Sequence, residues 1–190
     1  MSQDPDFLNL LKSKPNIAAL CSESFLDDLC LSSVKVAFIL CGNFKNLPDI
    51  VSKTQDAGIV PFVHIDLIDG LSTQDGAVDF IKEYTCARGI ITTRSNQIRR
   101  AHALDLLAIH RYFVFDAFSL ASIKKQIATC PADAVEVLPG VILSVIKSLS
   151  SVASIPLIVG GFVNTVQDIS NALSAGASGI STSDHNLWYL

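Results

Sequence analysis

The sequence has 190 residues, of which 49% are hydrophobic and 17% charged, so it can bury a sizeable core and does not have the composition of a disordered chain. Its formal net charge of −4 gives no general support to nucleic-acid binding, and no apolar run approaches the roughly 18 residues of a membrane-spanning helix. The scattered cysteines, and an acidic start without a signal-peptide pattern, favour a cytoplasmic protein without disulfides.

Eight short apolar runs recur along the chain, at intervals of 19 to 29 residues. They begin near Ile17, Val36, Val60, Gly89, Tyr112, Val135, Pro156 and Ser178. Each interval fits a strand, a helix and two short loops. Because the runs are continuously apolar rather than alternating, they are typical of parallel strands covered by helices.

Helix signals separate these runs. Residues 1–16 predict an N-terminal helix that caps one end of the fold. Ser72 stands three residues before Asp75, as in a capping box, and Asn164 stands three residues before Gln167 in the same way. A glycine, Gly176, is placed to end the helix that follows Asn164.

The repeated pattern predicts one α/β domain over residues 1–190, a compact (β/α)8 TIM barrel. The alternative is an open doubly wound sheet, in which the weak runs at Ile17 and Gly89 are not strands. In a parallel barrel the functional groups gather at the carboxyl ends of the strands. The polar residues at those ends are therefore the candidate site residues.

The third run ends in His64 and Asp66. Residues two apart share one face of a strand, and in a barrel that face is the lumen. A carboxylate at the end of an apolar strand is costly unless it has a partner or faces a wet pocket. For His64 the alternative is a histidine whose polar atoms are satisfied within the core.

Three further charged residues follow or interrupt the middle runs. Arg94 could hold a phosphate, pair with a carboxylate of the lumen, or simply be solvated. Asp116 ends the fifth run. Glu136 stands between Val135 and Val137, so its side chain points away from theirs, and inside a barrel it needs a ligand, an ion pair or a proton.

The last two runs end in VGG and STS. Glycines let a backbone approach an anion closely, hydroxyls donate hydrogen bonds, and the N-terminus of the next helix offers further N–H groups. In barrels the loops after strands seven and eight are the usual phosphate site. The predicted phosphate-binding residues are Gly160, Gly161, Ser181, Thr182 and Ser183, and the alternative is a tight turn followed by a serine cap.

The sequence predicts no metal site, cofactor or catalytic nucleophile. It has no His-x-x-x-His pair and no Gly-x-Ser-x-Gly elbow, and no lysine ends a strand in its second half. The five arginines all lie between residues 88 and 111. Arg99, Arg100 and Arg111 are therefore candidate RNA contacts, and the alternative is an ordinary solvated helix.

Several long motifs occur in a fixed order, among them HIDLIDGLS, GIITTRSNQI, VEVLPGVI, PLIVGGFV and ALSAGASGISTSDHNLW. Between His64 and Trp188 the chain resembles the glycerol-3-phosphate-responsive antiterminators of bacterial glycerol operons. The resemblance implies a TIM barrel that senses glycerol 3-phosphate and acts on an mRNA leader, so that transcription passes a terminator. Phe162 departs from the pattern, in which Leu-Ile follows the two glycines.

The resemblance also assigns roles at the strand ends. It places the phosphate on Gly160, Gly161 and Ser181–Ser183. It places the glycerol hydroxyls near His64, Asp66 and Glu136, with Arg94 and Asp116 at the mouth. Ligand binding would shift the protein toward an RNA-competent or homodimeric state.

Two other functions stay open. The first is an enzyme acting on a small phosphorylated polyol or sugar, with Asp66 and Glu136 as an acid/base pair. The second is a paralogue that keeps the barrel and senses another phosphorylated metabolite.

Overall fold

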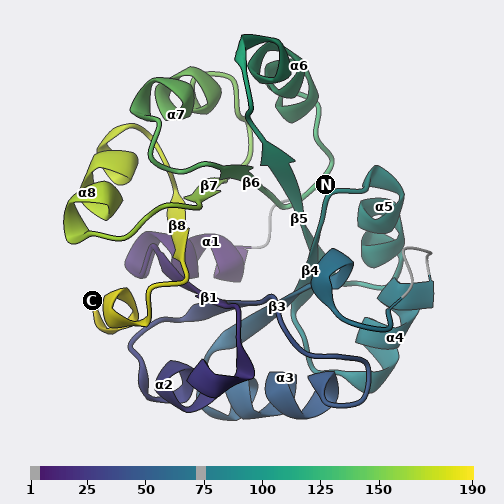
Figure 1. Cartoon of the computed structure of the whole chain (residues 1–190). Helices are drawn as coiled ribbons and strands as arrows, with labels where there is room; N and C mark the ends of the chain where they lie inside the picture. The colour runs from purple at the N-terminus through teal and green to yellow at the C-terminus, as the bar shows by residue number, and fades with distance from the viewer. Residues whose placement is uncertain (1–4, 72–75) are drawn as a thin grey trace.

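The computed structural model of the protein describes residues 5–71 and 76–190. Eight parallel strands pair in chain order and close into a barrel (Figure 1). They are β1 (Asn16–Leu20), β2 (Val36–Ile39), β3 (Val60–His64), β4 (Gly89–Thr92), β5 (Leu107–Phe113), β6 (Ala134–Leu138), β7 (Leu157–Gly160) and β8 (Gly179–Thr182). The predicted (β/α)8 barrel is confirmed, and the open sheet is wrong because β1 pairs with β8 as well as with β2.

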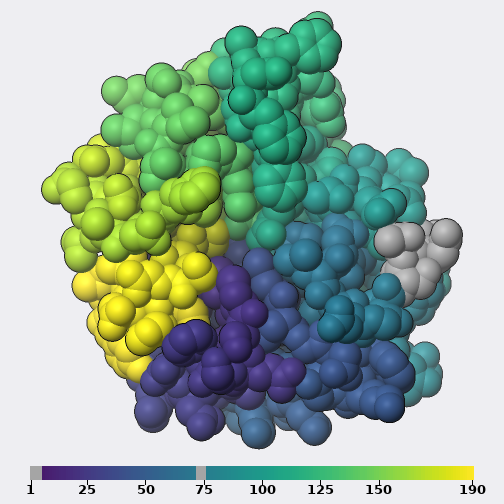
Figure 2. All heavy atoms as spheres, in the orientation of Figure 1, coloured from purple at the N-terminus to yellow at the C-terminus, as the bar shows by residue number. Residues whose placement is uncertain are grey.

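Helices connect the strands and cover the outside of the barrel (Figure 1). They are α2 (Leu26–Leu31), α3 (Leu47–Asp56), α4 (Gly76–Tyr84), α5 (Ser95–Ala103), α6 (Ala117–Ile127), α7 (Leu143–Ser150) and α8 (Val166–Ser174). Helix α1 (Pro5–Ser13) precedes β1, and the short 3₁₀ helices of the described residues are η1 (Glu23–Phe25), η2 (Ile65–Leu67) and η3 (His185–Tyr189). The first strand, β1, pairs with the last, β8, so purple and yellow atoms lie side by side in Figure 2.

The lower part of the barrel lumen is a packed apolar core. Alternate residues of each strand point inward, and Phe38, Phe62 and Ile109 belong to this buried cluster. Helix α1 lies across the opening at the amino ends of the strands (Figure 1), where Phe7 and Leu11 join the same cluster. Burial of each such large side chain stabilises the fold by about 1.5–3 kcal/mol.

Some boundaries differ from the predictions. Strand β5 begins at Leu107 rather than near Tyr112, because its inward and outward polar residues interrupt the apolar pattern while still forming ladder hydrogen bonds. The capping pair predicted at Asn164 is wrong by one residue, since Thr165 caps α8 and its hydroxyl accepts from the N–H of Asp168.

Other sequence predictions have different outcomes. Gly176 follows α8 with a φ of 106°, as expected for a glycine that ends a helix. The Ser72–Asp75 capping pair lies outside the described residues. Among residues 5–71 and 76–190, no helix is long and apolar enough to cross a membrane.

Candidate functional site

A ring of polar side chains lies above the apolar layers of the lumen. Strand alternation directs it inward, because His64 stands two residues after the lumenal Phe62, and Arg111 two residues after the lumenal Ile109. By the same alternation, Glu136 follows the lumenal residue at position 134. These side chains belong to the half of the barrel that leads to the carboxyl ends of the strands.

Three members of this ring form one hydrogen-bonded chain. Arg111 Nε donates to Glu136 Oε2 at 2.6 Å, and Ser181 Oγ donates to Glu136 Oε1 at 2.6 Å. The Arg111 side chain is 6% exposed and that of Glu136 1%. Removing one partner of such a buried ion pair leaves an uncompensated charge, which is strongly destabilising.

Gly160 makes room for this chain. A Cβ at position 160 would overlap Ser181 Oγ and lie 3.2 Å from Glu136 Oε1. The first of the paired glycines is therefore required by the packing of two buried polar side chains. The sequence assigned it to phosphate binding, and the structure adds a local steric reason for it.

Two of the predicted contacts need correction. Arg111 was expected to contact RNA, yet its side chain lies in the lumen and does not form part of an outer surface. Glu136 was expected to face the ligand directly, but it is 0% exposed, and each of its carboxylate oxygens already accepts a hydrogen bond. Both differences follow from the pairing of β5 with β6, which places Arg111 beside Glu136.

His64 is 3% exposed, and within the described part of the chain its Nδ1 atom is buried without a hydrogen-bond partner. Burial, and next the positive charge of Arg111, lower the pKa of His64 to about 3. The ring is therefore neutral at physiological pH. One ring nitrogen carries a proton and the other does not, so a neutral ligand group can be bound by either donation or acceptance.

Asp66 ties together the ends of β3 and β4. It lies in η2, where its Oδ2 accepts from the backbone N–H of Thr93 at 2.9 Å and from Thr92 Oγ1 at 3.1 Å. Arg94 Nε lies 3.3 Å from Asp66 Oδ1, and the Arg94 side chain is about half exposed. Arg94 therefore pairs with a carboxylate near a strand end, one of the three roles that the sequence allows for it.

Asp116 has a local structural role. It is the N-cap of α6, and its Oδ1 accepts from the backbone N–H of Ser119 at 2.7 Å. That hydrogen bond lowers the pKa of Asp116. The carboxylate is thus occupied by helix capping, and a contact with ligand would be an additional role.

The predicted phosphate cradle has fewer free donors than the sequence indicated. Ser181 donates to Glu136, and Thr182 Oγ1 donates to the carbonyl of Val163 at 2.7 Å. Ser183 is exposed. The assignment of Ser181 and Thr182 hydroxyls as free phosphate donors is therefore corrected, because both are spent on contacts within the protein.

The residues that lead into α8 are also hydrogen-bonded. Asp168 accepts hydrogen bonds from the backbone N–H groups of Asn164 and Thr165, at 3.2 and 3.0 Å. Between this cap and β7 the chain turns through Gly161 and Phe162, with φ values of 79° and 62°. A turn of successive backbone N–H groups is a form of anion site that needs no hydroxyl.

The three arginines predicted to contact RNA do not share one surface. Arg99 is exposed on α5. Arg100 forms an ion pair with Asp79 of α4, and Arg111 is in the lumen. Exposure therefore separates Arg99 and Arg100, whose side chain is 39% exposed, from the buried Arg111, and of the two only Arg100 forms the ion pair described above.

An apolar hollow of about 460 Å³ beside the mouth of the barrel is not among the sites that the sequence predicts. Phe162 and Phe115 are 77% and 83% exposed there. Phe113 stacks on Phe115 with ring centroids 6.1 Å apart. The hollow is lined by Phe113, Val114, Phe115, Leu138, Pro139, Ile142, Gly161 and Phe162. The sequence does contain an indication of this hollow, since apolar residues continue past the ends of β5 and β7 in the stretches FVF and GGFV.

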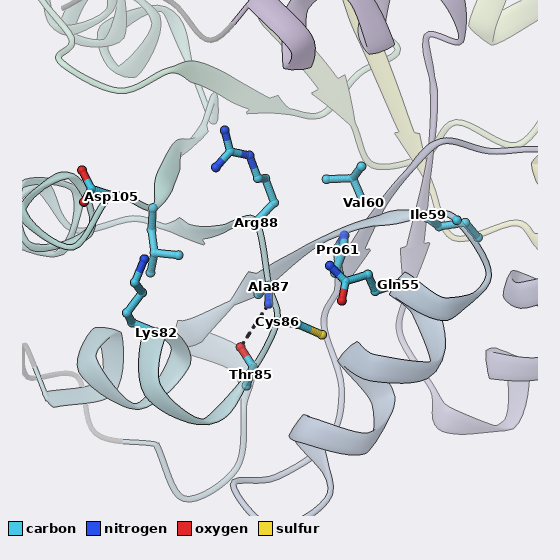
Figure 3. A pocket seen from close by; sticks show the side chains of 12 residues that line it. Gln55, Ile59, Val60, Pro61, Lys82, Thr85, Cys86, Ala87, Arg88 and Asp105 are labelled. Carbon is cyan, nitrogen blue, oxygen red and sulfur yellow. Dashed lines mark hydrogen bonds between the residues drawn. The ribbon is translucent and has the colours of Figure 1, made fainter.

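A second hollow lies at the opposite end of the barrel (Figure 3). Its residues precede or begin β3, β4 and β5, among them Val60, Arg88 and Leu106. Lys82 and Asp105 both line it (Figure 3). Functional sites of barrels occur at the carboxyl ends of the strands, so the polar ring is the stronger candidate.

The family model described as "Glycerol-3-phosphate responsive antiterminator" matches residues 16–188. That match spans all eight strands and the whole polar ring. The chain belongs to the glycerol-3-phosphate responsive antiterminator family.

Relatives of this family are similar along nearly the whole chain. An uncharacterized Escherichia coli protein, YgcP, is 35% identical over 183 residues, which cover 96% of each chain. A glycerol uptake operon antiterminator regulatory protein from Listeria monocytogenes has a TM-score of 0.85 at 29% identity, covering 91% of this chain and 94% of its own.

A glycerol uptake operon antiterminator-related protein from Thermotoga maritima has a TM-score of 0.81 at 30% identity, covering 93% of this chain and 99% of its own. Aldolase and epimerase structures at 15% identity or less share the fold alone. These enzymes and the family therefore have the barrel fold in common.

Proposed function

We propose that this protein is a ligand-responsive transcription antiterminator that binds glycerol 3-phosphate at the mouth of its barrel and acts on an mRNA leader. The observation that carries the proposal is the polar ring of His64, Arg111, Glu136 and Ser181, set directly below the turn that follows β7. A small ligand with a charged end and a hydroxylated end matches this combination of an open turn and a buried polar lumen.

The phosphate is assigned to the turn at Gly160 and Gly161 and to Ser183. The chain turns at Gly161 and Phe162, whose φ values are positive, and a phosphate can accept from N–H groups in such a turn. Ser183 supplies an exposed hydroxyl. The hydroxyls of Ser181 and Thr182 donate to Glu136 and to the carbonyl of Val163, and these hydrogen bonds support the loop.

The glycerol end is assigned to the lumen and its rim. His64 offers a neutral buried ring, and Arg94 is the exposed cation of the rim. Asp66 and Asp116 are held by hydrogen bonds at the rim, where their remaining lone pairs can accept from hydroxyls. Glu136 acts through its two partners, since it is fully buried.

Ligand binding is tested by calorimetry with glycerol 3-phosphate, glycerol and inorganic phosphate. We expect Ser183→Asp to weaken glycerol 3-phosphate binding at least tenfold, because it places a negative charge at the exposed hydroxyl of the proposed cradle. Ser170→Asp is the matched control, since Ser170 is exposed on α8 and adds the same charge outside the mouth. Equal affinities of the two variants would reject the phosphate assignment.

RNA binding is tested separately with a glycerol-operon leader RNA at low salt, with and without glycerol 3-phosphate. Phosphate contacts by arginine give binding that weakens as salt rises. We expect Arg99→Gln to weaken the loaded complex and to reduce its salt dependence by about one counterion, and light scattering to report any dimer formed with ligand. A loaded protein that does not bind the leader would reject the RNA step while leaving ligand binding intact.

An enzyme acting on a phosphorylated polyol or sugar is the alternative. Its proposed acid/base pair, Asp66 and Glu136, is already engaged with arginine and hydroxyl partners, which favours binding over proton transfer. Turnover of triose or pentose phosphates, lost in Glu136→Gln without a loss of binding, would establish the enzyme and reject the regulator.

A further inference from the structure

The Nδ1 atom of His64 is a buried polar atom whose environment needs a physical explanation. It is buried, it belongs to a side chain that is 3% exposed, and it finds no hydrogen-bond partner in the part of the chain that the structure describes. A buried polar atom in this state costs free energy, so folded proteins keep few of them, and functional sites are one place where they persist. Its position on β3, two residues above the lumenal Phe62, directs the ring toward the inside of the barrel.

Arg111 offers complementary donors in the same layer. Its Nε donates to Glu136, and among the described residues the N–H groups of its two terminal nitrogens have no acceptor. Its charge lowers the pKa of His64 on β3, secondary to burial, and opposes the rise that burial causes in the pKa of Cys21, which follows β1. The guanidinium is therefore within electrostatic reach of groups at the carboxyl ends of β1 and β3.

The charge balance of this layer selects the type of ligand group. Arg111 and Glu136 neutralise each other at 2.6 Å, and the ring of His64 is neutral. A second negative group at this depth would lack a countercharge, and its burial would be costly. A hydroxyl carries no charge, accepts from a guanidinium N–H and donates to a ring nitrogen, so it can bind both residues at once.

We propose that His64 and Arg111 form a hydroxyl-binding subsite in the lumen, which distinguishes a phosphate ester of a polyol from a phosphate ester without hydroxyl groups. This inference rests on the proposed function, because it places the phosphate of the same ligand at the turn after β7. It moves Arg111 from the predicted RNA surface to ligand recognition. It also gives the orphaned nitrogen of His64 a partner in the loaded protein.

The test compares glycerol 3-phosphate with n-propyl phosphate, which keeps the phosphate and lacks both hydroxyls. We expect the wild-type protein to bind glycerol 3-phosphate at least tenfold more tightly, because a site built to hydrogen-bond a hydroxyl is left with unpaired groups by the analogue. His64→Phe should abolish most of this preference by weakening glycerol 3-phosphate alone. The unliganded His64→Phe protein should melt no lower than wild type, since the change removes no hydrogen bond of Nδ1.

His110→Phe is the matched control. His110 is also buried on a strand of the barrel, but its ring bonds to Tyr112 outside the lumen. This variant should lose stability and keep the ligand preference. Arg111→Lys, which preserves the charge beside Glu136, should reduce the preference as His64→Phe does.

The outcomes separate the two hypotheses. If wild type binds both esters equally, or if His64→Phe keeps the full preference, the subsite is wrong while the phosphate site stands. If wild type binds neither ester, the proposed function is wrong and the subsite fails with it. If Arg111→Lys does not fold, the His64 and His110 variants still decide the result.

Discussion

Replacement of Gly160 by alanine tests whether the polar ring is as tightly packed as its geometry indicates. The added Cβ would lie less than 3.0 Å from Ser181 Oγ and 3.2 Å from Glu136 Oε1. Neither neighbour can move freely, because Ser181 and Glu136 are bonded to each other and both are buried. The methyl group must therefore displace the serine hydroxyl, break its hydrogen bond, or shift the end of β7.

The expected cost has two parts. Forcing a methyl group into a packed interior costs about 1–3 kcal/mol. Loss of a buried hydrogen bond to a carboxylate costs roughly 1.5–3 kcal/mol. When the serine hydroxyl moves away and its hydrogen bond breaks, the steric clash is relieved, so the two costs do not add in full. We therefore expect Gly160→Ala to lower the free energy of unfolding by about 2–4 kcal/mol.

Urea denaturation of four proteins measures this cost: wild type, Gly160→Ala, Ser181→Ala and the double variant. If the clash is with the Ser181 hydroxyl, the Gly160→Ala change should cost less when that hydroxyl is absent, so the two effects should not add. Gly76→Ala is the control, since a Cβ there meets no atom of the described residues within 4 Å, and as a glycine-to-alanine change in a helix it should not lower stability. A Gly160→Ala effect as small as this control, or strict additivity with Ser181→Ala, would refute the packing argument.

Three further changes have defined outcomes. Arg111→Met should lower the free energy of unfolding by about 3–5 kcal/mol by leaving Glu136 unpaired, and adding Glu136→Leu should restore much of it in the same urea assay. The pKa of His64 in the folded protein is about 3, below its ordinary value of 6.5. Between pH 6.5 and pH 3 the unfolded chain therefore binds a proton at His64 that the folded chain does not bind. The free energy of unfolding should fall as the pH drops through this range, by up to about 1.4 kcal/mol per pH unit from this group. In His64→Phe the free energy of unfolding should depend less steeply on pH over the same range. An unchanged dependence would contradict the lowered pKa of His64. Phe162→Gly should raise stability by about 1 kcal/mol, because Phe162 holds a φ of 62° with an exposed side chain, and a lower melting temperature would show that the ring is needed for packing.

Local sequence was sufficient to predict the barrel itself. Each strand is a short apolar run, and each connection has the length of one helix with its loops, so the eight-fold repeat is visible without knowledge of any distant contact. The lumen-facing position of Glu136 was also predicted, since it depends only on the alternation of side chains along a strand. The same information placed glycines and hydroxyls at the ends of β7 and β8.

The partners of the site residues were decided by tertiary structure. Arg111 pairs with Glu136, 25 residues away, and Ser181 bonds to Glu136 across 45 residues. Both contacts exist because β6 lies next to β5, and because β8 reaches β6 over a glycine of the intervening strand β7. In the sequence, the cluster of arginines between residues 88 and 111 has the appearance of one basic face. In the closed barrel, Arg99 lies on an outer helix and is exposed, whereas Arg111 lies on a strand and its side chain points into the lumen. The sequence by itself therefore determined which polar residues stand at the strand ends, and only the closed barrel decided which of them are spent on one another and which stay available to a ligand.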